Sequence, residues 1–301
     1  MNKITERMRE RAQELLAKGE VEWVIGWEKG SLWYHSSPAF VRRPEEVERL
    51  IWDDFCANNL AKYLLDFTQL EGKVALFVKG CDSKGINRLL QDQQIEREKV
   101  YIIGITCPGV RDARKARGKG PEALETIDLE ERCTFCTRPE PVIFDEIINT
   151  GEKLPGRGEK EPRDRFTEVE RLLALSPDER YEFWAKQYER CLRCYACRNV
   201  CPACNCRECI FDRSQSGWCS KRIVKTENEF YGLTRALHVA GRCIECGECE
   251  RVCPVGIPIM SLHRKIIKDL NELFGPYEAG LDTETPPPLG TYRTEDPDYF
   301  V

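Results

Sequence analysis

The sequence predicts a chain of mixed α+β and α/β class in two parts. The N-terminal part is expected to be an α/β domain with a small parallel sheet, because two short apolar runs, 74–78 and 100–105, flank a helical segment. The C-terminal part is expected to be a helical domain organised by cysteines. One cysteine run of fixed spacing occurs there twice, starting at Cys191 and at Cys243.

Composition indicates a globular chain and excludes two classes of function. The 301 residues suffice for about two domains. Lys and Arg number 46 against 51 Asp and Glu, so the formal charge of −5 offers no broad basic surface for nucleic acid. No apolar stretch is long enough to cross a membrane, and residues 1–7 carry no signal-peptide core, so we expect a cytoplasmic protein.

The beginning of the chain is predicted to supply a helix and a hairpin. Apolar residues recur at helical spacing over 3–18. Two strands are expected next, over 21–27 and 31–34, around a Glu-Lys-Gly turn. A further helix is expected to begin at 44–50 and to run towards 60–65.

A βαβ unit follows and defines the class of the N-terminal part. The runs 74–78 and 100–105 have the length and composition of buried strands, and 85–94 has the pattern of the helix between them. We therefore expect an α/β domain over 1–150. The next stretch, 151–175, is rich in Gly, Pro and charge, which is typical of a linker.

The C-terminal part is predicted to begin with a well-capped helix. Ser176 and Glu179 have the spacing of a capping box, and Pro177 occupies the first helical position. The expected organisation is a domain over 176–275, a cysteine-rich insert within it over 202–242, and an extended tail over 276–301.

Two more amphipathic helices are expected in this part, over 226–239 and 260–274. On the first of them, Phe230, Leu233 and Leu237 share one face.

The repeated run predicts ligands for two [4Fe–4S] clusters. Its spacing is C-x2-C-x2-C-x3-C, each time followed by Pro. In this pattern three thiolates of one loop bind one cluster, and the fourth, one helical turn further on, binds the other cluster. A single run could be a zinc site or chance, and two complete copies argue against both. The predicted sets are a cluster 1 site of Cys191, Cys194, Cys197 and Cys253 and a cluster 2 site of Cys243, Cys246, Cys249 and Cys201.

Four N-terminal cysteines predict a third [4Fe–4S] cluster. Cys81 and Cys107 each follow a predicted strand, and ligands bind at the carboxyl ends of parallel strands. Cys133 and Cys136 form a C-x2-C pair that can complete four ligands. We name these four residues the cluster 3 site. The alternatives are buried structural cysteines or a structural zinc. Cys56 lies among apolar residues and is expected in the core.

The remaining four cysteines lie in the insert, and we call them the insert cysteines. Their spacings match no standard signature, so they could bind a fourth cluster or zinc, or could merely shield the neighbouring clusters. They are Cys204, Cys206, Cys209 and Cys219.

Local charge differs between the two repeated runs. The first contains Arg193 and Arg198, whereas the second contains Glu245, Glu248 and Glu250. Because positive charge favours the reduced cluster, we expect the cluster 1 site to have the higher reduction potential.

Residues 191–274 resemble bacterial-type dicluster ferredoxin domains, and Arg235-Ala-Leu-His-Val-Ala-Gly-Arg-Cys243 is similar to the ferredoxin segments of heterodisulfide-reductase-associated proteins. Residues 74–136 resemble the beta subunits of coenzyme F420-reducing hydrogenases and of formate dehydrogenases. This second resemblance rests on the segments Val78-Lys-Gly-Cys-Asp-Ser-Lys-Gly and Ile103-Gly-Ile-Thr-Cys-Pro-Gly.

The resemblance implies an electron-transfer subunit of an anaerobic cytoplasmic redox complex, such as a hydrogenase, a formate dehydrogenase or a heterodisulfide-reductase-like assembly. Its partners would be the other subunits. The alternative is a subunit that carries FAD and reduces or oxidises coenzyme F420 or NAD(P). The sequence has no G-x-G-x-x-G fingerprint after a strand, and it assigns no catalytic residue and no residue to a flavin.

Overall fold

The computed structural model describes residues 2–148, 163–213, 217 and 219–296. The chain divides into two compact units. Unit 1 comprises residues 1–163 together with 280–282, and unit 2 comprises residues 164–279 together with 283–301. Residues 151–162 of the segment expected as a linker, 151–175, lie outside the described residues.

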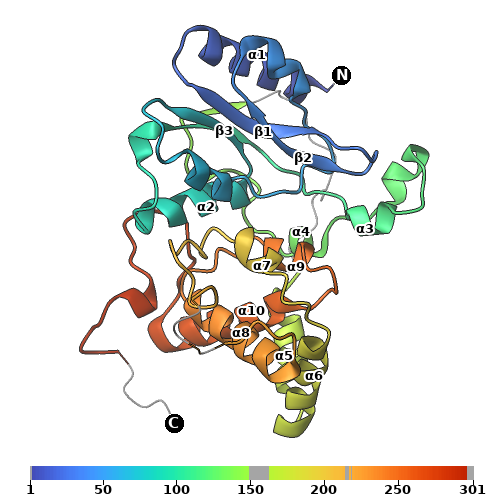
Figure 1. Cartoon of the computed structure of the whole chain (residues 1–301), viewed down its shortest axis with the longest axis vertical. Helices are drawn as coiled ribbons and strands as arrows, with labels where there is room; N and C mark the ends of the chain where they lie inside the picture. Colours follow the sequence, from blue (N-terminus) through green and yellow to red (C-terminus); the bar gives the residue numbers. More distant parts are fainter. Residues whose placement is uncertain (1, 149–162, 214–216, 218, 297–301) are drawn as a thin grey trace. The chain divides into compact units, whose positions relative to one another are not determined.

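Unit 1 is built on a five-stranded sheet of order β2-β1-β3-β4-β5. Strands β1, β2 and β3 are labelled in Figure 1. β1 and β2 pair antiparallel as a hairpin, and the other neighbours are parallel. β3, the helix α2 and β4 form the predicted βαβ unit, and both strands have the predicted limits. The strands are β1 Trp23–Lys29, β2 Ser36–Val41, β3 Val74–Val78, β4 Val100–Ile105 and β5 Glu146–Ile148.

The helices of unit 1 agree in part with the predicted ones. The first helix is confirmed, whereas the expected helix from 44 is a short 3-10 turn that ends before a second one begins at Ala61. The elements are α1 Lys3–Ala17, η1 Pro44–Arg49, η2 Ala61–Phe67, α2 Gly80–Gln91, η3 Arg97–Lys99, α3 Ala113–Ala116, η4 Pro121–Thr126 and α4 Glu131–Thr134.

The core of unit 1 forms around the central strands. Every residue of β3 is buried, as a strand covered on both faces requires. From α1, Met8, Ala12 and Leu15 are fully buried at helical spacing. A Cβ at Gly26 of β1 would lie 2.8 Å from Leu50 Cδ2, so the strand needs glycine for this close packing.

Two predictions for unit 1 were wrong in their limits. The second hairpin strand is 36–41 rather than 31–34, because the chain turns through the residues between before it pairs. α2 begins at Gly80 rather than at residue 85. Its start is fixed by Asp82, whose Oδ2 accepts a hydrogen bond from the Lys79 backbone amide at 2.8 Å.

Unit 2 is helical in the described residues. The capping box of its second helix is confirmed, since Ser176 Oγ accepts from the Glu179 amide at 3.3 Å. α5 lies inside the segment expected as a linker. None of the helices among the described residues is long and apolar enough to cross a bilayer. The elements are α5 Thr167–Leu173, α6 Pro177–Glu189, α7 Ala196–Asn199, α8 Lys225–His238, α9 Glu248–Arg251, α10 Ile259–Phe274 and η5 Pro288–Gly290.

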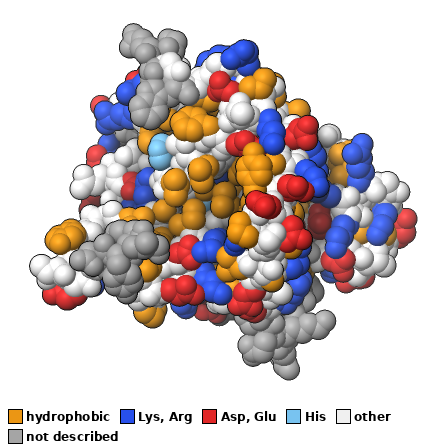
Figure 2. All heavy atoms as spheres, turned by 90° about the horizontal axis from the view of Figure 1, so that it is seen from below, with side chains coloured by type: hydrophobic (Ala, Val, Ile, Leu, Met, Phe, Trp, Pro, Cys, Tyr) orange, Lys and Arg blue, Asp and Glu red, His pale blue; other side chains and the backbone are white. Residues whose placement is uncertain are grey.

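α8 buries its polar side and exposes its apolar side. Phe230, Leu233 and Leu237 are 38%, 53% and 57% exposed. Tyr231 and Arg235 of the same helix are buried. Apolar side chains also gather near the middle of the molecular face seen in Figure 2, among charged ones. Because an amphipathic helix ordinarily turns its apolar side inward, the inner side of α8 must face groups that polar side chains can contact.

Candidate metal centres

The two cysteine runs of unit 2 fold into loops of the same backbone conformation. Arg193 and Tyr195 flank the second cysteine of the first loop with φ of 46° and 61°. Glu245 and Gly247 occupy the same positions of the second loop with φ of 56° and 68°. A short helix follows each loop, α7 and α9, and these two helices contact each other. Left-handed backbone is unfavourable for residues other than glycine, so this repetition indicates a specific local requirement.

Backbone amides donate to the sulfurs in these loops. The amide of Arg193 donates to Cys191 Sγ at 3.4 Å, and the amide of Ile257 donates to Cys253 Sγ at 3.4 Å. Such N–H groups stabilise negative charge on sulfur. The loop conformation thus prepares the thiols to act as thiolate ligands.

The fourth cysteine of the second run lies with the first three of the first run. Burial raises the pKa of Cys191, and the nearby thiols of Cys197, Cys253 and Cys194 raise it further. The thiols of Cys253, Cys197 and Cys194 therefore lie within electrostatic range of Cys191. These four cysteines are the residues of the cluster 1 site.

The reciprocal arrangement holds for the cluster 2 site. Burial raises the pKa of Cys243 to about 12, and the thiol of Cys201 contributes to the rise. Burial also raises the pKa of Cys246 well above its usual range, with Cys201 and Cys249 contributing. Cys201, the last cysteine of the first run, therefore lies with the three of the second loop.

The chemistry of these two groups fits iron–sulfur clusters. Neighbouring thiols can all ionise only beside compensating positive charge, which iron supplies. Within the described residues, no three His, Cys, Asp or Glu side chains lie close enough together to hold a single metal ion.

A buried arginine of α8 interacts with both groups. Arg235 donates from Nη2 to the carbonyl oxygen of Cys197 at 2.9 Å, and its Nη1 lies 2.8 Å from Nε2 of His263. Burial opposes its charge, but nearby thiols, first those of Cys249 and Cys201, leave its pKa well above the usual value. Burial and the Arg235 charge lower the pKa of His263 to about 3, so its imidazole is neutral and accepts from Arg235.

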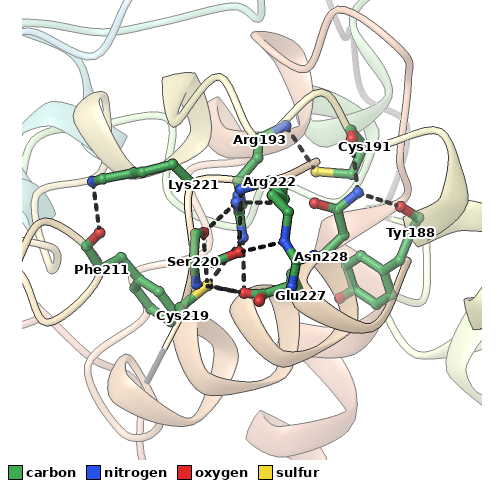
Figure 3. A network of polar contacts seen from close by, with 10 residues as sticks. All are labelled: Tyr188, Cys191, Arg193, Phe211, Cys219, Ser220, Lys221, Arg222, Glu227 and Asn228. Atoms are coloured by element: carbon green, nitrogen blue, oxygen red, sulfur yellow. Dashed lines mark hydrogen bonds and ion pairs between the residues drawn. The ribbon is translucent and has the colours of Figure 1, made fainter. Parts of the chain in front are cut away.

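A second arginine, Arg193, joins the first loop to the insert (Figure 3). Its guanidinium donates to the backbone carbonyls of Ser220 and Arg222 and to Cys219 Sγ, the last at 3.0 Å. Nη1 also lies 3.4 Å from Oε2 of Glu227. These contacts fix the buried Arg193 in its left-handed conformation. Sequence reasoning saw its charge but not this positioning role.

The structure does not bring the insert cysteines together. Cys204 lies beside Cys201, and their hydrogen bond is the first cause of a Cys201 pKa lowered to about 5. Cys209 contacts the guanidinium of Arg198. Cys219 donates to Glu227 Oε2 at 2.8 Å.

The fourth of these residues, Cys206, is exposed. The insert cysteines thus have separate environments rather than one common centre.

In unit 1, the cysteines of the cluster 3 site converge at the end of the parallel strands. Cys81 lies in the first turn of α2 and Cys107 follows β4. Burial raises the pKa of Cys107 to about 12, and the thiols of Cys133 and Cys136 contribute. Burial raises the pKa of Cys81 as well, with a contribution from Cys107. The carboxyl ends of neighbouring parallel strands account for the meeting of the first two.

A buried lysine accompanies these four thiols. Lys79 is 2% exposed, and its Nζ lies 2.9 Å from Asp82 Oδ2 and 4.0 Å from the ring centroid of Trp27. Its charge interacts with Cys81 and Cys107. Sequence reasoning missed this residue, although a lysine directly between a buried strand and a cysteine is a recognisable signal.

Ion pairs offset the charges that distinguish the two loops of unit 2. Each arginine of the first loop has a carboxylate partner, and two glutamates of the second have arginine partners. The pairs are Arg193 with Glu227, Arg198 with Asp212, Glu245 with Arg165 and Arg264, and Glu248 with Arg251. The expected difference in reduction potential loses much of its electrostatic basis.

Comparison with known proteins first identifies the class of domain that contains the two cysteine runs. Residues 187–257 match the family model of the 4Fe–4S dicluster domain, the segment that holds both cysteine runs. The chain therefore carries such a domain, as its cysteine spacing predicted.

Relatives are found along nearly the whole chain. It is 26% identical to the F420-dependent formate dehydrogenase subunit beta of Methanocaldococcus jannaschii, over 91% of each chain. It is 25% identical to the F420-dependent formate dehydrogenase 1 subunit beta of Methanococcus maripaludis, over 92% of this chain and 90% of that one. The predicted resemblance to beta subunits is confirmed. The prediction that the chain is an iron–sulfur electron-transfer subunit of an oxidoreductase is confirmed as well.

Proposed function

We propose that this chain is the iron–sulfur subunit of a formate dehydrogenase complex that uses coenzyme F420. Similarity to two such subunits over nine-tenths of the chain supports a formate dehydrogenase over a hydrogenase or a heterodisulfide-reductase-like complex. The partners would be the formate-oxidising subunit and any further subunits of that complex.

The observation that carries the proposal is the exchange of cysteines between the two loops of unit 2. Cys253 lies with the first loop and Cys201 with the second. This exchange is expected of two neighbouring [4Fe–4S] clusters and of no single-metal site. When bound, the clusters would supply one-electron steps.

We propose three clusters and assign their ligands from this arrangement. The cluster 1 site is Cys191, Cys194, Cys197 and Cys253; the cluster 2 site is Cys243, Cys246, Cys249 and Cys201; the cluster 3 site is Cys81, Cys107, Cys133 and Cys136. The separate surroundings of the insert cysteines support no fourth cluster.

The residues around each site would hold and insulate the clusters. The amides of Arg193 and Ile257 would stabilise charge on the ligand sulfurs. In unit 1, a Cβ at Gly80 would lie 2.0 Å from the carbonyl oxygen of Arg138, so glycine allows that segment to close over the start of α2. The backbone amides and the close packing at Gly80 would thus help to hold the cysteine ligands in place.

A flavin is the second candidate group, and unit 1 contains one observation in its favour. Formate oxidation releases two electrons together, coenzyme F420 accepts two, and iron–sulfur clusters carry one at a time, so a complex of this kind needs a two-electron to one-electron converter such as FAD. Arg88 of α2 is buried, and its Nε and Nη1 have no hydrogen-bond partner among the described residues. Asn87 Oδ1 is likewise unpartnered there. These atoms fit an anionic or polar group of a cofactor.

We also propose a cytoplasmic, anaerobic setting. All 17 cysteines lie among the described residues and none forms a disulfide. So many thiols without disulfide bonds are typical of a reducing compartment.

Anaerobic analysis of the purified chain tests the cluster assignment. We expect about twelve irons and as many acid-labile sulfides per chain from three clusters. About eight irons would contradict the third cluster but not the other two. A colourless chain containing zinc would contradict the proposed electron-transfer function. One flavin released by acid would support the converter in unit 1.

Reconstitution tests the identity of the complex. The chain is combined anaerobically with a formate-oxidising subunit, and formate-dependent bleaching of coenzyme F420 is followed. The expected result is reduction that requires this chain, and the matched control is a Cys194→Ala, Cys246→Ala variant. Equal rates with the variant would contradict electron transfer through unit 2.

A further inference from the structure

The inner side of α8 places an unusual cation beside both cysteine groups of unit 2. Arg235 is 5% exposed. Two of its three nitrogens have partners, the Cys197 carbonyl oxygen at 2.9 Å and His263 Nε2 at 2.8 Å. Its Nε is buried and has no hydrogen-bond partner among the described residues. A guanidinium is always charged, so this site buries a full positive charge.

This charge is not offset by a carboxylate. The two partners of Arg235 are a carbonyl and a neutral imidazole, and no acidic side chain pairs with it in the part of the chain that the structure describes. Arg193 and Arg198, by contrast, form ion pairs. Arg235 thus differs from both arginines of the first loop.

Thiols of both groups interact with this charge. Cys197 belongs to the cluster 1 site, whereas Cys201 and Cys249 belong to the cluster 2 site. Reduction of a cluster by one electron adds one negative charge. A buried cation stabilises that charge more strongly than a surface cation does, because the local dielectric is low.

We propose that Arg235 is a positioning residue whose single charge raises the reduction potentials of both clusters of unit 2 together. This inference rests on the proposed function, since it requires both clusters. One cation that acts on both clusters shifts the two potentials in the same direction, so it makes both clusters easier to reduce without adding to the difference between them. His263 serves this role as a neutral acceptor that orients the guanidinium without cancelling its charge.

Potentials of the full-length, cluster-loaded chain test the proposal. Each cluster of unit 2 is titrated anaerobically, with its reduced form followed by electron paramagnetic resonance. In Arg235→Gln, which keeps a donor but removes the charge, we expect the reduction equilibrium constant of both clusters to fall at least tenfold, or about 59 mV for a one-electron couple. Arg171→Gln removes an exposed arginine of α5 and is expected to leave both potentials unchanged.

The conservative variant separates charge from structure. Arg235→Lys retains the charge, and we expect the reduction equilibrium constants of both clusters to stay within about threefold of the wild type. If Arg235→Gln fails to load iron, the lysine variant decides alone: unchanged potentials support the proposal, and a tenfold fall overturns it.

Two further results would overturn it. One is a shift confined to a single cluster, and the other is no shift in a loaded Arg235→Gln chain. Either result would leave the proposed function intact, because the clusters themselves would still be present. A wild-type chain that holds no cluster would overturn the proposed function, and this inference with it.

Discussion

The hydroxyl of Tyr231 lies 3.4 Å from the Sγ of Cys197. Tyr231 is one helical turn before Arg235 on α8, so the two side chains approach the first loop from the same side. Burial is the main cause of a pKa of Tyr231 well above its usual value, which keeps the hydroxyl protonated. Beside a thiolate ligand it therefore acts as a donor.

Removal of this hydroxyl is expected to lower one potential only. Tyr231→Phe should lower the reduction potential of the cluster 1 site, because the reduced cluster places more charge on the sulfur and loses a hydrogen bond of about 1 kcal/mol. The measurement is a redox titration of both clusters. Tyr181→Phe, an exposed tyrosine of α6, is the control. An equal shift in both clusters would contradict the assignment of Cys197 to the cluster 1 site.

The cluster 3 site is tested by iron content. The double variant Cys133→Ala, Cys136→Ala should lose about four irons per chain, because two thiolates cannot hold a [4Fe–4S] cube. Cys56→Ala is the matched control, since Cys56 is fully buried in the core of unit 1 and its Sγ contacts Asp53 and the Ile51 carbonyl. Equal iron in the double variant and the wild type would show that these thiols are structural.

The insert cysteines are expected to bind no cluster. Cys219→Ala should retain the full iron content, whereas Cys194→Ala, at a proposed ligand, should lose about four irons. The reason is geometric: Cys219 contacts Arg193 and Glu227 rather than the other insert cysteines. Iron and zinc are counted in both variants. Loss of metal from Cys219→Ala would restore the hypothesis of a fourth centre.

The stability of the protein is expected to fall in mild acid because of His263. Its pKa is about 3 in the folded chain, whereas the pKa of a histidine in an unfolded chain is about 6.5. The unfolded state therefore binds the proton first as pH decreases. The free energy of unfolding should fall between about pH 6.5 and 3, by up to about 1.4 kcal/mol per pH unit.

His263→Gln should remove that component of the pH dependence, because glutamine can accept from Arg235 without taking up a proton. Urea unfolding is measured anaerobically at pH 7.5 and at pH 5.5. His238→Gln, at an exposed position on α8, should behave like the wild type. The same loss of stability in His263→Gln would mean that other groups cause it.

Local patterns were sufficient for much of the fold. β3 and β4 have the predicted limits, because a buried parallel strand is a short apolar run whose ends are set by the residues next to it. The start of α6 could also be predicted from the sequence, since Ser176 and Glu179 cap it within a single turn. The end of the hairpin and the start of α2 were not, because β2 pairs by register with β1 and Asp82 acts through its side chain.

The exposure of the apolar side of α8 also could not be predicted from local sequence. Helical spacing shows that Phe230, Leu233 and Leu237 share a face, but it cannot show which face is buried. In the structure, the polar side with Tyr231 and Arg235 is buried, since it contacts the first cysteine loop. Packing around thiols reverses the usual preference.

The sequence alone determined the chemistry of this protein, and the tertiary structure decided its electrostatics. Ligand spacing is local, so two cysteine runs and their prolines were enough to predict a dicluster domain. Charge is not local. Glu227 and Asp212 offset the arginines of the first loop, and Arg235, distant in sequence from that loop, retains an uncompensated charge beside it. Electrostatic energy depends on distance in space and on burial, and only the folded chain establishes both.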